Sequence, residues 1–220
     1  MSPVPVVRHS GTAAPLRRRD VDTDQIIPAE FCKRLGRTGY EDTLFHRWRQ
    51  EADFVLNRPA HAGASILVAG PDFGIGSSRE HAVWALRDFG FRAVVAPSFG
   101  DIFRANAAKN QLVTPRVPEE AVERLWALVE ADPATEVTVD LAERVLLAGD
   151  LRIPFEIGEH SRWQLMSGLD DIDITLRRGG GIDAHEERRP RWLPRIAASR
   201  AAVGGTDDGT DDGTAPPKAG

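Results

Sequence analysis

Two hydroxyls and a guanidinium come together in one short stretch, FGIGSSREHA, at residues 73–82. The apolar run SILVAG precedes it, so we expect a buried strand that turns through glycines into a helix. Free amides at a helix start bind anions, and Arg79 can bond both oxygens of a planar carboxylate. Gly76 lets the backbone approach such a ligand closely. The stretch therefore indicates an organic-acid site in which Ser77 or Ser78 is a candidate base or nucleophile.

A simpler interpretation of the same stretch is a helix cap. Ser77 and Glu80 fit the S-x-x-E pattern of a capping box, in which the serine hydroxyl accepts from a helical amide and the glutamate reaches back. That pattern does not explain Arg79, because a cation in a first helical turn opposes the helix dipole by about 0.3 to 1 kcal/mol. Anion binding and simple capping both remain open at this point.

Other uses of these residue types fit the spacing poorly. A P-loop requires a lysine after the second glycine, and a dinucleotide fingerprint requires a third glycine where Arg79 stands. A Ser-His-Asp order cannot be traced from the spacing of His81. The stretch DVDTD at residues 20–24 imitates the start of a calcium loop, but Gln25 and Phe31 occupy the positions that need Gly and Glu.

Alternating apolar strands and amphipathic helices must position the site. Because helical crossovers join the strands around it, we expect a parallel sheet there. Three strand-like pieces with turn residues between them, TEVTVDL, ERVLLAG and LRIPFEI, predict antiparallel pairing. The pattern as a whole predicts an α/β body with mixed sheets. The predicted strands are 65–70 and 92–98, and the predicted helices are 78–89, 99–109, 118–132 and 160–167.

The first part of the chain gives weaker signals. Residues 1–15 are rich in Pro, Ser, Gly and Ala, and we expect an irregular lead-in. The run before Pro28 predicts a short buried strand that the proline ends. Residues 32–64 lack a steady period and predict a long loop with a short helix near 42–49, and loops of that length are usually functional or mobile.

Composition limits the class of protein. The chain has 220 residues and a formal net charge of -5, and its near-neutral body argues against nucleic acid as a partner. Cys32 is the single cysteine, and the sequence shows neither a secretion signal nor an apolar run of membrane-spanning length, so we expect a cytoplasmic protein without membrane contact. The repeated TDDG unit in residues 201–220 predicts a disordered tail.

Several blocks resemble one known family. FGIGSSREHAVWAL resembles the signature of the aconitase-type swivelling domain, and DVDTDQIIPAEF with APSFGDIFRANAAKNQLV resembles the small subunits of bacterial 3-isopropylmalate dehydratase. The resemblance extends from residue 9 to residue 178 and implies a three-layer β/β/α swivelling domain at 1–181, a charged extension at 182–200 and a disordered tail at 201–220. Ile75 departs from the cysteine of many members.

The resemblance implies a hydro-lyase that interconverts 2- and 3-isopropylmalate with a large subunit that carries a [4Fe-4S] cluster. No cofactor is expected on this chain, since a cluster takes about three or four thiolates. Two alternatives stay open: a related hydro-lyase acting on homoaconitate or a methyl-substituted malate, and a non-catalytic carboxylate-binding module. By position the resemblance implies a base at Ser77. It implies that the dicarboxylate substrate is bound by Arg79, Ser78, Gly76, Arg37 and Thr38. It also implies that Asp22 and Thr23 support the Gly-rich loop, although ordinary use of these two residues in a turn is an equal alternative.

Overall fold

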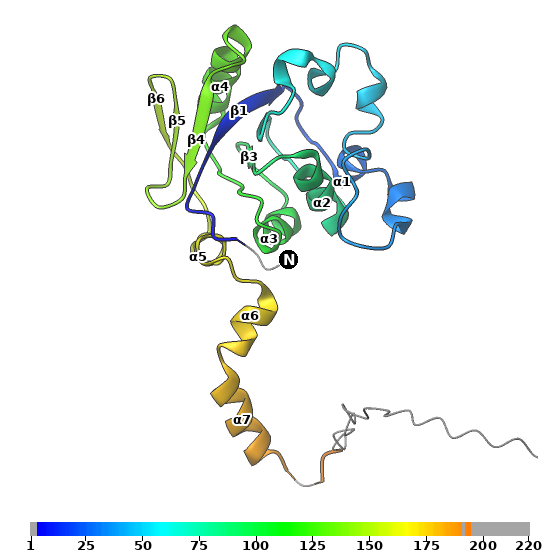
Figure 1. Ribbon diagram of the computed structural model, residues 1–220, viewed down its shortest axis with the longest axis vertical. Coiled ribbons are helices and arrows are strands. Elements are labelled where there is room, and N and C mark those ends of the chain that lie inside the picture. The colour runs from blue at the N-terminus through cyan, green and yellow to red at the C-terminus, as the bar shows by residue number, and fades with distance from the viewer. Residues whose placement is uncertain (1–3, 191, 195–220) are drawn as a thin grey trace, which may run out of the picture. The chain divides into compact units, whose positions relative to one another are not determined.

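One long strand, β1 (Arg8–Leu16), joins the parallel and antiparallel halves of a six-stranded sheet (Figure 1). Its residues 13–16 pair in parallel with β2, and its residues 8–12 pair antiparallel with β4. The computed structural model describes residues 4–190 and 192–194. The strand order is β3 (Ala93–Val95), β2 (Ile66–Ala69), β1, β4 (Glu136–Asp140), β5 (Val145–Ala148) and β6 (Leu151–Pro154).

Two apolar cores lie on opposite faces of the parallel strands. Leu67 of β2 packs into the core shared with helices α2 (Glu80–Phe89) and α3 (Asp101–Lys109), whereas Ile66 and Val68 pack into the other core. That second core is completed by the curled strands β4 to β6 and by α4 (Glu119–Ala131). A strand buried on both faces reads as a continuous apolar run, as SILVAG does. The predicted three-layer β/β/α arrangement with mixed pairing is confirmed.

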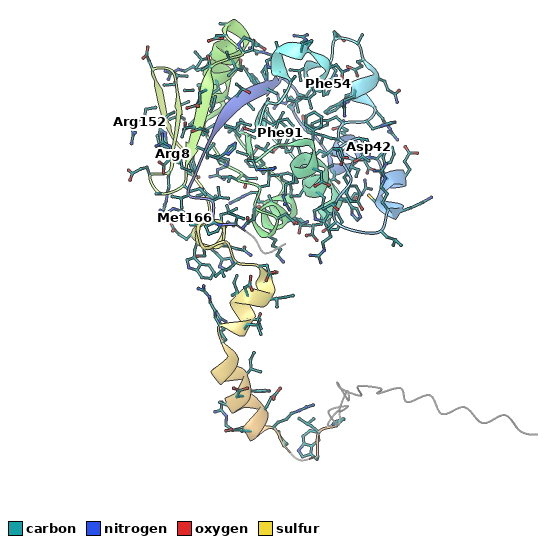
Figure 2. All side chains as sticks on the ribbon, in the orientation of Figure 1. Arg8, Asp42, Phe54, Phe91, Arg152 and Met166 are labelled. Carbon is teal, nitrogen blue, oxygen red and sulfur yellow. The ribbon has the colours of Figure 1, made fainter. Side chains whose placement is uncertain are left out.

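Most elements around the candidate site lie where the sequence predicts them. Helices α2, α3 and α4 begin and end within two residues of their predicted bounds, and Pro118 stands at the N-cap of α4. Helix α5 (Glu159–Ser167) ends at Gly168 in a left-handed conformation, and α6 (Asp171–Leu176) follows it. Phe91, labelled in Figure 2, is fully buried in the core beneath α2. Local periodicity was thus sufficient for the helical side of the fold.

Three predictions for the first part of the chain are wrong. The predicted irregular lead-in contains β1, which is held by partners far away in sequence. The predicted strand before Pro28 is a short helix, α1 (Thr23–Ile26), because Asp22 caps it by accepting from the Gln25 amide at 2.8 Å. The predicted helix near 42–49 is a series of turns that leads into the 3-10 helix η2 (Trp48–Gln50).

The long loop itself is confirmed, but it is well packed. Within it lie the 3-10 helices η3 (Val55–Asn57) and η4 (Pro59–His61) in addition to η2, and η1 (Ala29–Lys33) overlaps its start. Tyr40, Leu44 and Phe45 are fully buried against the core beside α2. The loop is therefore anchored to the domain by aromatic and aliphatic side chains, although it lacks strands.

The chain divides into two units, residues 1–177 and 178–220. The second unit contains α7 (Gly179–Arg188) among its described residues. The predicted boundaries at residues 181 and 200 remain predictions, and the predicted disordered tail at 201–220 lies outside the described residues. Within the part of the chain that the structure describes, none of the helices has the length and apolar character needed to cross a membrane.

Candidate active site

The Gly-rich loop between β2 and α2 lies alongside the segment that enters α1. The Gly74 amide donates to the Val21 carbonyl at 2.7 Å, and the Thr23 amide donates to the Ile75 carbonyl at 3.0 Å. Asp22 and Ile75 form a parallel bridge between the two segments. This two-segment pairing fixes the backbone that carries the serines, even though no regular strand is formed there.

Two glycines give the loop its path. Gly74 has a φ of +74°, and a Cβ added there would lie 2.3 Å from Cγ of Phe103. Gly76 has a φ of +90°, where a Cβ would lie 3.4 Å from the Asp22 Cβ, an ordinary contact. Gly74 is thus required both by conformation and by the close approach of α3, whereas Gly76 is required by conformation. The turn at Gly76 leaves Ser77 and the residue after it exposed.

Thr23 holds Ser77 by its backbone, and no hydrogen bond of the Ser77 hydroxyl is found among the described residues. The Thr23 hydroxyl donates to the Ser77 carbonyl at 3.0 Å, and Thr23 itself is 2% exposed. Asp22, the other predicted support residue, contributes its backbone to the bridge while its carboxylate caps α1. Both predicted support residues therefore lie directly beside the loop, and only Thr23 bonds it through a side chain.

The capping box of Ser77 and Glu80 is not formed. Helix α2 has Arg79 as its N-cap residue, in an extended conformation, and no side chain caps it. The Glu80 carboxylate instead accepts from Nδ2 of Asn110 at 2.7 Å. The simple capping interpretation of the motif is wrong. The hydroxyls of Ser77 and Ser78 lie exposed beside an uncapped helix start.

Arg79 is oriented by a carboxylate that the sequence analysis did not assign to the site. Nη1 of Arg79 donates to Oδ1 of Asp24, and the Arg79 side chain is 19% exposed. The hydrogen bond to Asp24 raises the pKa of Arg79, so the guanidinium stays charged. Among the described residues no further hydrogen bond of this guanidinium is found, which leaves its remaining donors for a ligand. The DVDTD stretch was the available signal, but its spacing alone does not single out Asp24 as a partner of Arg79.

Two titratable side chains adjoin the Arg79 pair. Burial raises the pKa of the Cys32 thiol, and the nearby Arg79 charge opposes that shift. Burial lowers the pKa of His81, whose ring lies 4.6 Å from that of Trp84 and 5.6 Å from that of Tyr40, centroid to centroid. His81 is held in an aromatic cluster, which suits a packing role.

Arg37 and Thr38 lie on a separate exposed loop after η1. Arg34 braces this loop by donating to both carboxylate oxygens of Asp42 at 2.7 and 2.8 Å and to the Gly39 carbonyl at 2.6 Å. The Tyr40 hydroxyl bonds within the same loop. Among the described residues, no hydrogen bond or ion pair joins Arg37 or Thr38 to the serine loop. Arg37, Thr38 and the 99% exposed Leu35 are therefore accessible to solvent on this loop.

The donor set of this chain does not suit an iron-sulfur cluster. A cluster takes about three or four thiolates, and Cys32 is the only cysteine of the sequence. Within the described residues, no group of three His, Cys, Asp or Glu side chains is placed to hold a metal ion. A metal-dependent step would need ligands from another chain.

Comparisons with known proteins concern the chain as a whole. The family profile of the aconitase C-terminal domain matches residues 4–120, and the LeuD_N profile matches residues 123–159. A protein named 3-isopropylmalate dehydratase small subunit from Clavibacter michiganensis is 56% identical over 90% of the chain and 98% of that relative. One of the same name from Acidothermus cellulolyticus is 60% identical, over 89% of the chain and 99% of that relative.

The fold is also found in a solved structure. A crystal structure described as 3-isopropylmalate dehydratase from Methanocaldococcus jannaschii has a TM-score of 0.60 and 24% identity, and the match covers 81% of this chain and 99% of that chain. At that identity the likeness supports the fold alone. Membership of the family rests on the sequence relatives and the family profiles.

Proposed function

Because the chain belongs to the family of 3-isopropylmalate dehydratase small subunits, we propose that it interconverts 2- and 3-isopropylmalate, in leucine biosynthesis, together with a large subunit. The reaction is a dehydration followed by a rehydration. The observation that carries the proposal is the uncapped start of α2, where the exposed Ser77 and Ser78 stand beside the Asp24-oriented guanidinium of Arg79. These groups can hold a carboxylate and move a proton at one place.

Ser77 is the proposed base that takes the carbon-bound proton of the substrate. Its hydroxyl is exposed and uncommitted among the described residues, while Thr23 fixes its carbonyl. A helix start contributes up to about 2 kcal/mol, which lowers a pKa by only about 1.5 units. A serine in water would stay mostly neutral under that influence. Further positive charge and the exclusion of water must therefore accompany substrate binding.

Arg79 is the proposed carboxylate-binding group. Its pair with Asp24 uses one terminal nitrogen and leaves donors that can bond a carboxylate side by side. Ser78 and the backbone amides at Gly76 and Ser77 would complete the binding of this dicarboxylate substrate. Asp24 orients Arg79 and keeps its charge, and therefore acts through it.

The partner follows from the exposure of the site. Ser77 and Ser78 face solvent in this chain, so a large subunit would have to cover them to exclude water. We assign the [4Fe-4S] cluster to that subunit, where it would supply Lewis-acid chemistry at the leaving hydroxyl. No cofactor is assigned to this chain, and we place the complex in the cytoplasm without nucleic-acid or membrane contact.

The substrate preference is assigned to the loop with Arg37 and Thr38. The 99% exposed Leu35 beside them can contact an alkyl group. Each buried methylene is worth about 0.8 kcal/mol, so small changes in this loop would shift the preference among related malates. Homoaconitate and methyl-substituted malates are the competing substrates that the same geometry would accept.

Reconstitution tests the proposal directly. The full chain would be assembled anaerobically with its large subunit and assayed with isopropylmalate and homoaconitate, beside each subunit alone. We expect turnover of isopropylmalate by the complex and none by this chain alone. A preference for homoaconitate would reassign the substrate. Carboxylate binding without turnover by any assembly would favour a non-catalytic module instead.

A further inference from the structure

A buried asparagine, Asn110, joins the end of α3 to the start of α2. Its Oδ1 accepts from the indole Nε1 of Trp84 at 3.0 Å, and its Nδ2 donates to Oε1 of Glu80 at 2.7 Å. Nδ2 also donates to the Asn106 carbonyl at 2.9 Å. Asn110 is 9% exposed, and these three hydrogen bonds give both polar atoms of its buried side chain partners inside the protein.

The chemistry of the two neighbours suits a carboxamide between them. The indole N–H of Trp84 can only donate, and the ionised carboxylate of Glu80 can only accept. A single side chain bridges both only if it offers an acceptor on one side and a donor on the other. Aspartate would place a second carboxylate against Glu80, and leucine would offer neither group. This pairing also fixes which atom of the Asn110 amide is nitrogen.

Two starts of helix α2 compete for the same residues. In one, Ser77 is the N-cap, its hydroxyl accepts from the Glu80 amide, and the Glu80 carboxylate accepts from the Ser77 amide. In the observed one, Arg79 is the N-cap and the helix begins at Glu80, whose carboxylate is held by Asn110. The first start would occupy the Ser77 hydroxyl. The second leaves it available.

We propose that Asn110 is a positioning residue that keeps the Ser77 hydroxyl available by holding Glu80 away from it. Among the described residues no hydrogen bond joins Asn110 to Ser77 or Arg79, so Asn110 acts through Glu80. Trp84 in turn fixes the orientation of the Asn110 carboxamide. This inference rests on the proposed role of Ser77 and adds the reason why an S-x-x-E sequence does not cap its own helix here.

The kinetic test uses the full chain assembled with its large subunit. A hydrogen bond to a charged group is worth enough to change a rate by about tenfold to a hundredfold, so we expect Asn110→Leu to lower kcat within that range. Glu80→Ala should lower kcat less, because no carboxylate is left to close the capping box. The double variant should recover toward the Glu80→Ala value. A double variant no faster than Asn110→Leu would overturn the proposal.

A matched pair of tryptophans separates positioning from packing. Trp84→Phe and Trp126→Phe each delete one indole hydrogen bond from a buried ring, the second being a 2.8 Å bond from Trp126 to the Val68 carbonyl in the other apolar core. We expect similar losses of thermal stability but a lowered kcat for Trp84→Phe alone. Equal kcat values would contradict the proposal, and this pair remains informative if Asn110→Leu fails to fold.

Hydrogen exchange gives a readout that does not depend on activity. In the full chain, Asn110→Leu should slow exchange at the amides of Ser77 and Glu80 by about fivefold, since a formed cap is worth about 1 kcal/mol. Unchanged or faster exchange at both amides would refute the competing helix start. If the wild-type complex does not turn over isopropylmalate, the proposed function fails while this measurement still judges Asn110.

Discussion

Replacing Thr23 by valine removes one hydrogen bond from the candidate site while keeping the shape of the side chain. The Thr23 hydroxyl donates to the Ser77 carbonyl at 3.0 Å from a position that is 2% exposed. The Ser77 carbonyl lies on an exposed residue and can turn to water, so the penalty for an unsatisfied group is small. Thr23→Val therefore tests how tightly the Ser77 backbone must be held.

The magnitude follows from the value of one hydrogen bond. Its net worth is about 0.5 to 1.5 kcal/mol, which lowers the melting temperature by about 2 to 4 °C per kcal/mol in a unit of this size. If the same free energy of about 1 kcal/mol is lost from the transition state, kcat falls about fivefold. The assays are thermal unfolding of the chain and steady-state turnover by the complex.

Thr138→Val is the matched control. Thr138 is 4% exposed and pairs its hydroxyl with that of Ser10 at 2.7 Å, in the antiparallel half of the sheet. Both variants should lose similar stability, whereas only Thr23→Val should lower kcat. Equal kcat values in the two variants would refute the idea that Thr23 positions the proposed base.

Three other predictions concern the Gly-rich loop backbone, the pH dependence of stability and the loop after η1. Gly74→Ala should cost about 2 kcal/mol more in unfolding free energy than Gly63→Ala. Both glycines have positive φ, but a Cβ at Gly74 would lie 2.3 Å from a phenyl ring, whereas one at Gly63 meets nothing within 4 Å. Equal costs for the two variants would contradict this prediction. Burial lowers the pKa of His61 below its usual 6.5, so the unfolded chain binds a proton more readily and stability falls as the pH drops below about 6.5. His61→Gln should flatten this fall of the melting temperature with pH. An unchanged dependence of the melting temperature on pH would disprove the role of His61. Arg34→Gln removes the paired hydrogen bonds from Arg34 to the Asp42 carboxylate. It should raise KM about twofold to fivefold with kcat nearly unchanged. An unaltered KM would count against a role of this loop in substrate binding.

The helical side of the fold could be predicted because its signals are local. The run SILVAG and the spacing of apolar residues in α2 to α4 fix strands and helices within a few residues of sequence. Strand β1 could not be predicted in this way. Its composition is typical of a coil. It forms a strand because it pairs with segments far along the chain, for example residue 13 with Ile66 and residue 8 with Asp140.

The candidate site divides in the same manner. The motif GSSRE could be predicted as a candidate anion site from residue types alone, and the structure brings Thr23 and Asp22 beside it. Asp24 and Asn110 could not be assigned, since they meet Arg79 and Glu80 across 55 and 30 residues of sequence. The S-x-x-E pattern even favours the opposite helix start, because it counts local bonds and omits the long-range partner of Glu80.

The central claim is that this chain supplies the base, at Ser77, to a complex whose iron belongs to the large subunit. Turnover of isopropylmalate by the anaerobically reconstituted Ser77→Ala complex tests it most directly. A positioned base contributes about a hundredfold to ten-thousandfold, so kcat should fall by that amount while KM stays close to the wild-type value. Wild-type turnover by the Ser77→Ala complex, or turnover by this chain without a large subunit, would contradict the account.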